Sequence, residues 1–220
     1  MAEAKAVSLT EEWGGGTLPY RVSHRKLGMW LFIMSDSLTF GALLTTYAYA
    51  RLSSVEWPTP FEFETSVVFS TMMTLVLLSS SLTMVFAVAA AKKRDKKKAR
   101  LWILATMLFG TAFIVLHAYE WLHLINDEGL TPFQLPVAWA HRWPHASPLF
   151  GSAFFGITGL HMFHVFTGVL YLGVIAGRIR KFTADDVEVS GLYWHFVDLV
   201  WMFVFPLIYL MSVDFTPGTH

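Results

Sequence analysis

Five long apolar segments constrain this chain more than any other feature of its sequence. They cover about residues 27–50, 67–91, 101–124, 149–177 and 190–213. A helix needs roughly 20 apolar residues to cross the hydrocarbon core of a membrane, and each segment is long enough. With 55% hydrophobic and only 15% charged residues, the 220-residue chain leaves no room for a large water-soluble domain. We predict an all-α, polytopic transmembrane bundle of five helices over residues 27–215, preceded by a tail over residues 1–26.

The positive charges predict how this bundle is oriented. Of the 16 Lys and Arg residues, 14 lie in the tail, in the 92–100 segment or in the 178–181 segment, and only Arg51 and Arg142 lie at the opposite side. Because loops rich in Lys and Arg stay in the cytoplasm, we predict a cytoplasmic N-terminus and an external C-terminus in a bacterial-type cytoplasmic (inner) membrane. We interpret AKKRDKKKAR as a basic turn of this topology rather than as a lipid-binding or nucleic-acid-binding patch.

Ionisable side chains inside the apolar segments are costly in hydrocarbon and mark functional or contact sites. Counting 1.5 Å per residue from the basic ends of the helices sorts them into two groups by height. The inner polar group lies at roughly 10 to 15 Å and consists of Asp36, His195 and Asp198. The outer polar group lies at roughly 21 to 30 Å and consists of His117, Glu120, His161 and His164.

The spacing of these residues in the sequence indicates which side chains lie on the same face of a helix. The pairs His117/Glu120, His161/His164 and His195/Asp198 are each three residues apart, so both members lie on one face of a helix. We therefore predict two hydrogen-bonded ties within the bundle. The outer polar group would pin the third helix against the fourth. The inner polar group would tie the last helix, with Asp36 of the first helix as a candidate third member.

Other chemistry remains open for the same residues. Carboxylates and imidazoles three residues apart on several helices hold di-iron centres, but such a centre needs four carboxylates at one level and only Glu120 is available there. A haem held by His117 and His161 would match in height, and Asp36 could handle protons. We favour structural hydrogen bonding, with no metal bound by this chain.

Four stretches resemble subunit III of the haem-copper oxidases, the cytochrome c and quinol oxidases. GMWLFIMSDSLTFGALLTTYAY (28–49) is similar to that family's Gly-x-x-Leu-Phe-Ile-x-Ser-Glu helix, and HAYEWLHL (117–124) resembles its Gln-x-x-Glu-Trp segment. FFGITGLHMFHVFTGVLYL (154–172) resembles the Thr-Gly-x-His-Gly-x-His-Val helix, and EVSGLYWHFVDLVWMFVFPLIYL (188–210) the closing Tyr-Trp-His-Phe-Val-Asp-x-x-Trp helix. The chain departs from the pattern at Asp36 (Glu), His117 (Gln) and Met162 (Gly).

The resemblance implies a non-catalytic role in a short, five-helix form of the family. It implies that the haems and copper lie on subunits I and II, with no cofactor on this chain beyond bound phospholipid. This chain would pack beside subunit I and support assembly, stability and proton uptake during oxygen reduction. Two alternatives remain: a related subunit of a nitric oxide reductase or quinol oxidase, and a stand-alone membrane metalloprotein that uses the outer polar group.

Overall fold

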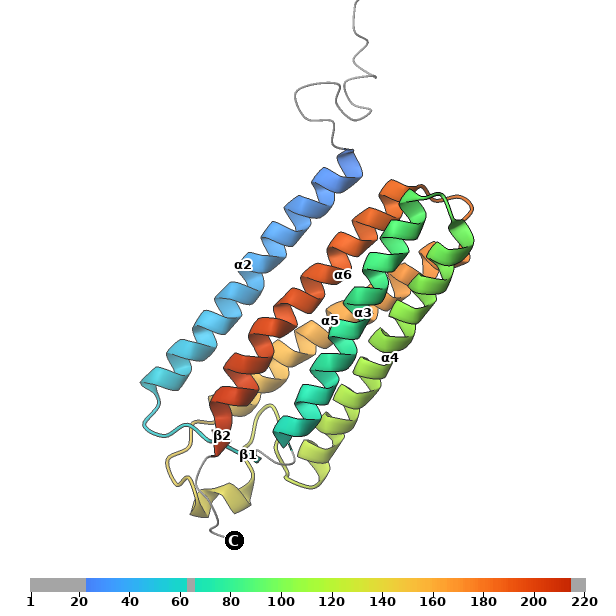
Figure 1. The fold of residues 1–220 in the computed structure, drawn as a ribbon. Coiled ribbons are helices and arrows are strands. Elements are labelled where there is room, and N and C mark those ends of the chain that lie inside the picture. Colours follow the sequence, from blue (N-terminus) through green and yellow to red (C-terminus); the bar gives the residue numbers. More distant parts are fainter. Residues whose placement is uncertain (1–22, 63–65, 215–220) are drawn as a thin grey trace, which may run out of the picture.

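The computed structural model describes residues 23–62 and 66–214, and within them it confirms the all-α fold of five helices long enough to span a membrane (Figure 1). These are α2 (His24–Ser53), α3 (Val68–Lys92), α4 (Lys96–Asn126), α5 (Leu149–Gly177) and α6 (Ala184–Val204). A π-helical turn (Phe205–Tyr209) and a 3-10 turn (Leu210–Ser212) extend α6, and a second 3-10 helix (Val137–His141) lies in the loop before α5. Nearly all of the predicted tail lies outside the described residues.

Helices α4 and α6 begin five or more residues before their apolar segments, because polar residues cap them. Asp95 accepts a hydrogen bond from the backbone N–H of Lys98, 3.0 Å away, so α4 begins about five residues before the predicted start. Thr183 and Asp186 form a reciprocal capping box at the start of α6. The first turns of both helices are therefore polar and lie at the basic end of the bundle.

One small element was not predicted. Residues Phe61–Glu62 (β1) and Val213–Asp214 (β2) pair as two parallel strands, with Phe61 opposite Val213. The pair joins the connection between α2 and α3 to the end of the α6 segment, at the far end of the bundle from the basic turns (Figure 1).

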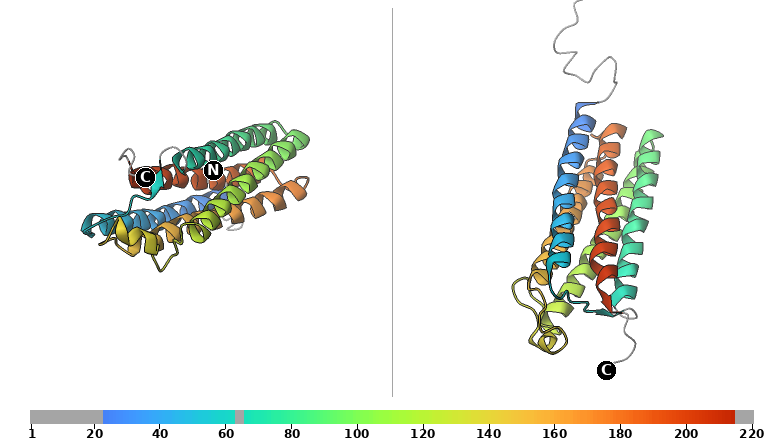
Figure 2. Two further views of the ribbon diagram at one scale, coloured as in Figure 1. Left: turned by 90° about the horizontal axis from the view of Figure 1, so that it is seen from below. Right: turned by 90° about the vertical axis from the view of Figure 1, so that its left-hand side faces the viewer.

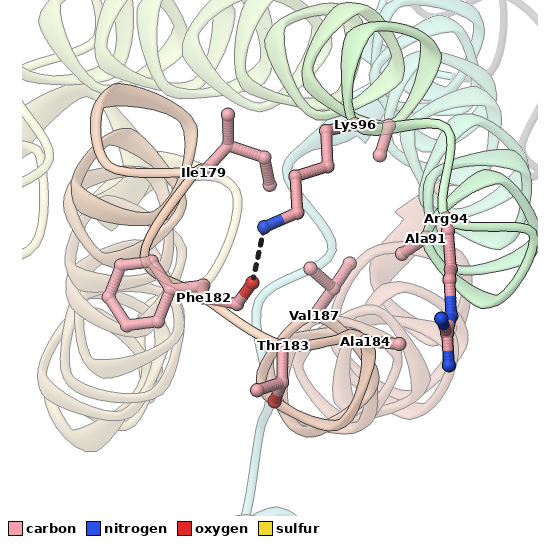
Figure 3. A pocket seen from close by; sticks show the side chains of 9 residues that line it. Ala91, Arg94, Lys96, Ile179, Phe182, Thr183, Ala184 and Val187 are labelled. Atoms are coloured by element: carbon pink, nitrogen blue, oxygen red, sulfur yellow. Dashed lines mark hydrogen bonds between the residues drawn. The ribbon is translucent and has the colours of Figure 1, made fainter.

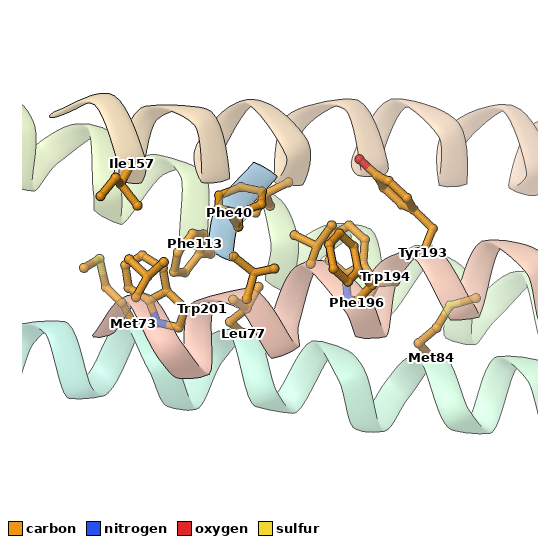
Figure 4. Packing of buried hydrophobic residues seen from close by; sticks show 14 of the residues in the cluster. Phe40, Met73, Leu77, Met84, Phe113, Ile157, Tyr193, Trp194, Phe196 and Trp201 are labelled. Carbon is orange, nitrogen blue, oxygen red and sulfur yellow. The ribbon is translucent and has the colours of Figure 1, made fainter. Parts of the chain in front are cut away.

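Helix α6 lies at the centre of the bundle and contacts α2, α3 and α5, while α3 packs along α4 and α4 along α5 (Figure 2). Two tryptophans anchor α6 to hydroxyl groups of α3. Trp194 Nε1 donates to Ser80 Oγ and Trp201 Nε1 donates to Thr74 Oγ1, each at 2.9 Å. Both rings are buried (Figure 4), and leaving either N–H unpaired would cost roughly 1 to 3 kcal/mol.

Glycines make room for the Trp194 ring. A Cβ atom at Gly110 of α4 would lie 2.5 Å from this ring, and a Cβ atom at Gly168 of α5 would lie 3.0 Å from it. The backbones of α4 and α5 can therefore approach α6 closely only because these positions carry no side chain.

Helix α2 packs differently from the other helices. It exposes large apolar side chains such as Leu38, and within the described chain it buries only Phe40, Tyr47 and Ala50. Polar contacts hold it at both ends. Near its start, Ser23 donates to Asp185 (2.6 Å), Arg25 pairs with Asp186 and Lys26 pairs with Glu188 (2.8 Å). Near its end, Tyr47 lies 3.2 Å from Ser212 Oγ, and Arg51 donates to the Met211 carbonyl.

Candidate functional site

Asp36 lies beside a histidine of the predicted outer polar group. Its Oδ2 atom is 3.4 Å from Nε2 of His164 on α5, although the contact lacks hydrogen-bond geometry. We expected Asp36 to meet His195 and Asp198 instead. Helix α2 begins at His24 and α5 ends at Gly177, so Asp36 and His164 both lie at roughly 18 to 20 Å from the basic ends of their helices. The difference in height that separated them in the sequence analysis is therefore absent.

The His164 ring is oriented by its own helix. Its Nδ1 atom lies 2.8 Å from the Leu160 carbonyl oxygen, which can only accept, so Nδ1 carries a proton. Its Nε2 atom is then the ring nitrogen that faces Asp36. The edge of the ring also contacts Phe40 of α2, with centroids 5.5 Å apart. Asp36 and His164 thus form a third polar contact that holds α2, midway along it.

His195 and Asp198 lie together as predicted, but Ser81 of α3 joins them. Ser81 Oγ donates to Asp198 Oδ2 at 2.7 Å, and His195 Nδ1 lies 3.3 Å from Ser81 Oγ. Because the hydroxyl proton is directed to the carboxylate, the imidazole Nδ1–H donates to Ser81. Asp198 is buried, and its Oδ1 atom has no hydrogen-bond partner among the described residues. This inner tie therefore joins α6 to α3, and Asp36 takes no part in it.

Glu120 forms a buried carboxyl site with two residues that the sequence did not single out. Tyr209, in the π-helical turn after α6, donates to Glu120 Oε2 at 2.7 Å, and Ser70 of α3 lies 3.1 Å from Oε1. The nearest nitrogen of His117, Nδ1, is 3.8 Å from Oε2, which is too far for a direct hydrogen bond. The predicted tie between Glu120 and the histidines of α5 is not formed.

His117 and His161 contact aromatic rings instead. The His161 ring stacks on Trp201 with centroids 5.0 Å apart, and Trp201 and Phe113 each contact both imidazoles. Their ring nitrogens have no hydrogen-bond partners within the described part of the chain. Although His161 and His164 are three residues apart, one faces this aromatic cluster and the other faces α2.

The outer polar group can be compared with what a metal ion or a haem would need. Within residues 23–62 and 66–214, no three His, Asp or Glu side chains come together as metal ligands. A haem between His117 and His161 would have to displace the rings of Phe113 and Trp201. Among the described residues, Glu120 is therefore hydrogen-bonded with Ser70 and Tyr209, and the two imidazoles pack against aromatic rings.

A comparison with known protein families matches the whole bundle to one family model. Residues 14–213 match the family model described as cytochrome c oxidase subunit III, and this range includes all the helices described above. The chain belongs to the cytochrome c oxidase subunit III family. The resemblance seen in the sequence is thereby confirmed.

Relatives in this subunit III family come from more than one type of oxidase. Cytochrome c oxidase subunit 3 of Bacillus subtilis (strain 168) is 34% identical over 193 residues, which cover 85% of this chain and 86% of the relative. Cytochrome bo(3) ubiquinol oxidase subunit 3 of Pseudomonas putida is 35% identical over 194 residues, with the same two coverages. This subunit III chain is therefore similar in length to these relatives.

Proposed function

We propose that this chain is the accessory subunit III of a proton-pumping haem-copper oxidase that reduces oxygen to water in aerobic respiration. The observation that carries the proposal is the family match over residues 14–213. In this proposal the haems and copper lie on subunits I and II. This chain supports the assembly, the stability and the proton uptake of subunit I, its main contact, and carries no redox centre of its own.

The inner tie is the proposed region of contact with subunit I. His195 lines a shallow hollow of about 290 Å³ between α3 and α6, with Lys92 and Glu188 at its basic end. Asp198, one helical turn from His195, is buried behind this hollow and fixes it through Ser81 of α3. With the N-terminus in the cytoplasm, this region faces the side of a bacterial cytoplasmic membrane from which pumped protons are taken up.

Purification of the tagged full chain in mild detergent tests the proposal. We expect haem, a large multi-helix subunit and oxygen-reducing activity to co-purify with the chain, as measured by reduced-minus-oxidised spectra and mass spectrometry. A nitric oxide reductase partner would show nitric oxide reduction instead. If the chain is isolated alone with bound iron or another metal, the accessory role is wrong and the chain is itself a metalloprotein.

Substitution at Asp198 tests the region of contact. Asp198→Leu removes the acceptor of Ser81 and leaves buried polar groups unpaired, at a cost of roughly 1 to 3 kcal/mol, so we expect several-fold less assembled complex. Asp198→Asn is the matched control, because its amide oxygen still accepts from Ser81. Assembly and proton pumping that are unchanged in Asp198→Leu would contradict a role for Asp198 in this contact.

A further inference from the structure

A hollow of about 380 Å³ lies at the basic end of the bundle, between the turn that joins α3 to α4 and the turn that joins α5 to α6. Small side chains, among them Ala184, leave the space open, and Ile179, Phe182 and Val187 give it an apolar lining. Figure 3 shows Lys96 reaching across this space towards the carbonyl oxygen of Phe182, with Arg94 on the side of Ala184.

The backbone of the first turn places these two cations. Arg94 has a φ of 59°, the left-handed conformation that lets α3 end and α4 begin within three residues. The Nζ atom of Lys96 donates to the carbonyl oxygens of Arg180, at 2.8 Å, and Phe182, at 3.4 Å. An ammonium group has three protons, so Lys96 keeps one donor for a ligand.

The acidic residues nearest the hollow are engaged elsewhere. Asp95 caps α4 through the N–H of Lys98, and this bond holds the pKa of Asp95 below its usual range. Asp186 binds Thr183 and Arg25, and Glu188 binds Lys26 and Lys92. Within the described part of the chain, no carboxylate pairs with Arg94 or Lys96. Asp185, beside Ala184, accepts from the Ser23 hydroxyl. Among the described residues, the two cations of the hollow are therefore in direct contact with no carboxylate.

We propose that this hollow binds the phosphate of an anionic phospholipid. Two cations beside an apolar lining, at the level where the helices leave the membrane, match a glycerophosphate headgroup and the start of its acyl chains. Basic pockets between transmembrane helices on the cytoplasmic side bind such headgroups. The sequence alone favoured a purely topological role for this basic turn, because it could not show that two distant turns enclose a space.

Paired charge substitutions test the site in the full chain, purified in mild detergent with whatever assembles with it. In Arg94→Gln/Lys96→Gln both cations of the hollow are lost. In the control Lys93→Gln/Lys97→Gln the same charge is lost from the same turn, but neither residue lines the hollow. Each cation near a membrane surface contributes about a fivefold gain in affinity, so we expect roughly 25-fold weaker retention of phosphatidylglycerol in the first variant only, as measured by mass spectrometry of bound lipid.

A third variant changes the shape without changing the charge. Ala184→Leu places a larger side chain in the hollow, and we expect it to lose the lipid while its haem and protein content match the parent. Equal loss of lipid from both double variants would show general surface attraction and overturn the site. Retention of lipid in all three variants would overturn it as well.

Reconstitution separates the lipid from free phosphate. In nanodiscs of phosphatidylcholine, we expect added phosphatidylglycerol to raise the Tm of the parent but not of Arg94→Gln/Lys96→Gln. Inorganic phosphate at millimolar concentration should not reproduce this shift in nanodiscs without phosphatidylglycerol. If it does, the anion is free phosphate and the assignment to a lipid is wrong.

Discussion

The hydroxyl of Ser70 has one proton and two neighbours that could take it. Its Oγ atom lies 2.8 Å from the carbonyl oxygen of Ser66 and 3.1 Å from Oε1 of Glu120. Both neighbours can accept, so the single Ser70 proton is shared between the Ser66 carbonyl and the Glu120 carboxyl group. Tyr209 donates to the other carboxyl oxygen of Glu120. We infer that Glu120 stabilises the bundle through its hydrogen bonds with these two hydroxyl groups.

This inference predicts how substitutions of Glu120 behave. In Glu120→Gln, the amide N–H can donate to Ser70 and the amide oxygen can accept from Tyr209, so we expect the Tm of the purified complex to stay close to that of the parent. In Glu120→Leu, the Tyr209 hydroxyl is buried without a partner, at a cost of about 1 to 3 kcal/mol, and the Tm should fall by several degrees. Equal losses in both variants would contradict this role, because the amide would then not replace the carboxyl group in the two hydrogen bonds.

Height along a helix was predictable only approximately, because it depends on where the helix ends, and rotation about the helix axis was not predictable. The arithmetic of 1.5 Å per residue found that His195 and Asp198 lie together, because they share one helix. It could not decide which neighbour Asp36 faces, and His164 lies there. Ser81 and Tyr209 were missed as site residues because serine and tyrosine are common in membrane helices, and only their contacts distinguish them.

At the scale of the element, helix α5 shows which glycines permit close packing. A Cβ atom at Gly168 would lie 3.0 Å from both Trp194 and Tyr193, whereas one at Gly156 would meet nothing within 4 Å. The sequence shows both residues as glycines in one apolar helix, and only the position of α6 separates their roles.

We expect the two glycines to respond differently to alanine. Gly168→Ala forces an extra methyl group against two rings in a packed core, which costs about 1 to 3 kcal/mol. Gly156→Ala is the control on the same helix and should not lower stability, because its methyl group meets nothing and alanine favours a helix more than glycine does. Thermal unfolding of the purified complex measures both, and a stable Gly168→Ala would mean that α5 and α6 are not packed as closely as described.

Existence and order of the helices were predictable, because each apolar segment is long enough to span a membrane. The starts of α4 and α6 were placed late, since a search for apolar residues ignores polar first turns that Asp95 and Thr183 cap. The β1–β2 pair was not predictable at all, because strands of two residues have no periodic pattern.

For the whole molecule, the distribution of Lys and Arg predicts which end faces the cytoplasm. The chain contains no cysteine, so an introduced thiol is the only one present. Lys97→Cys lies at the basic end, and Val137→Cys lies in the exposed loop at the other end. With the N-terminus in the cytoplasm, a membrane-impermeant thiol reagent added to intact cells should label the second variant and not the first.

Labelling after the membrane is opened provides the control, because both thiols should then react. The reverse pattern in intact cells would invert the proposed orientation and place the inner tie on the outer side of the membrane.

The contacts that hold α2 also set an order of events during synthesis. The partners of its polar ends lie about 160 residues later in the chain, in and after α6. At 5 to 20 residues per second, a ribosome needs roughly 10 to 30 s to make the intervening chain. Until then Arg25 and Arg51 have none of the partners described above. A nascent chain that stalls before α6 therefore carries a first helix whose polar ends lack their partners.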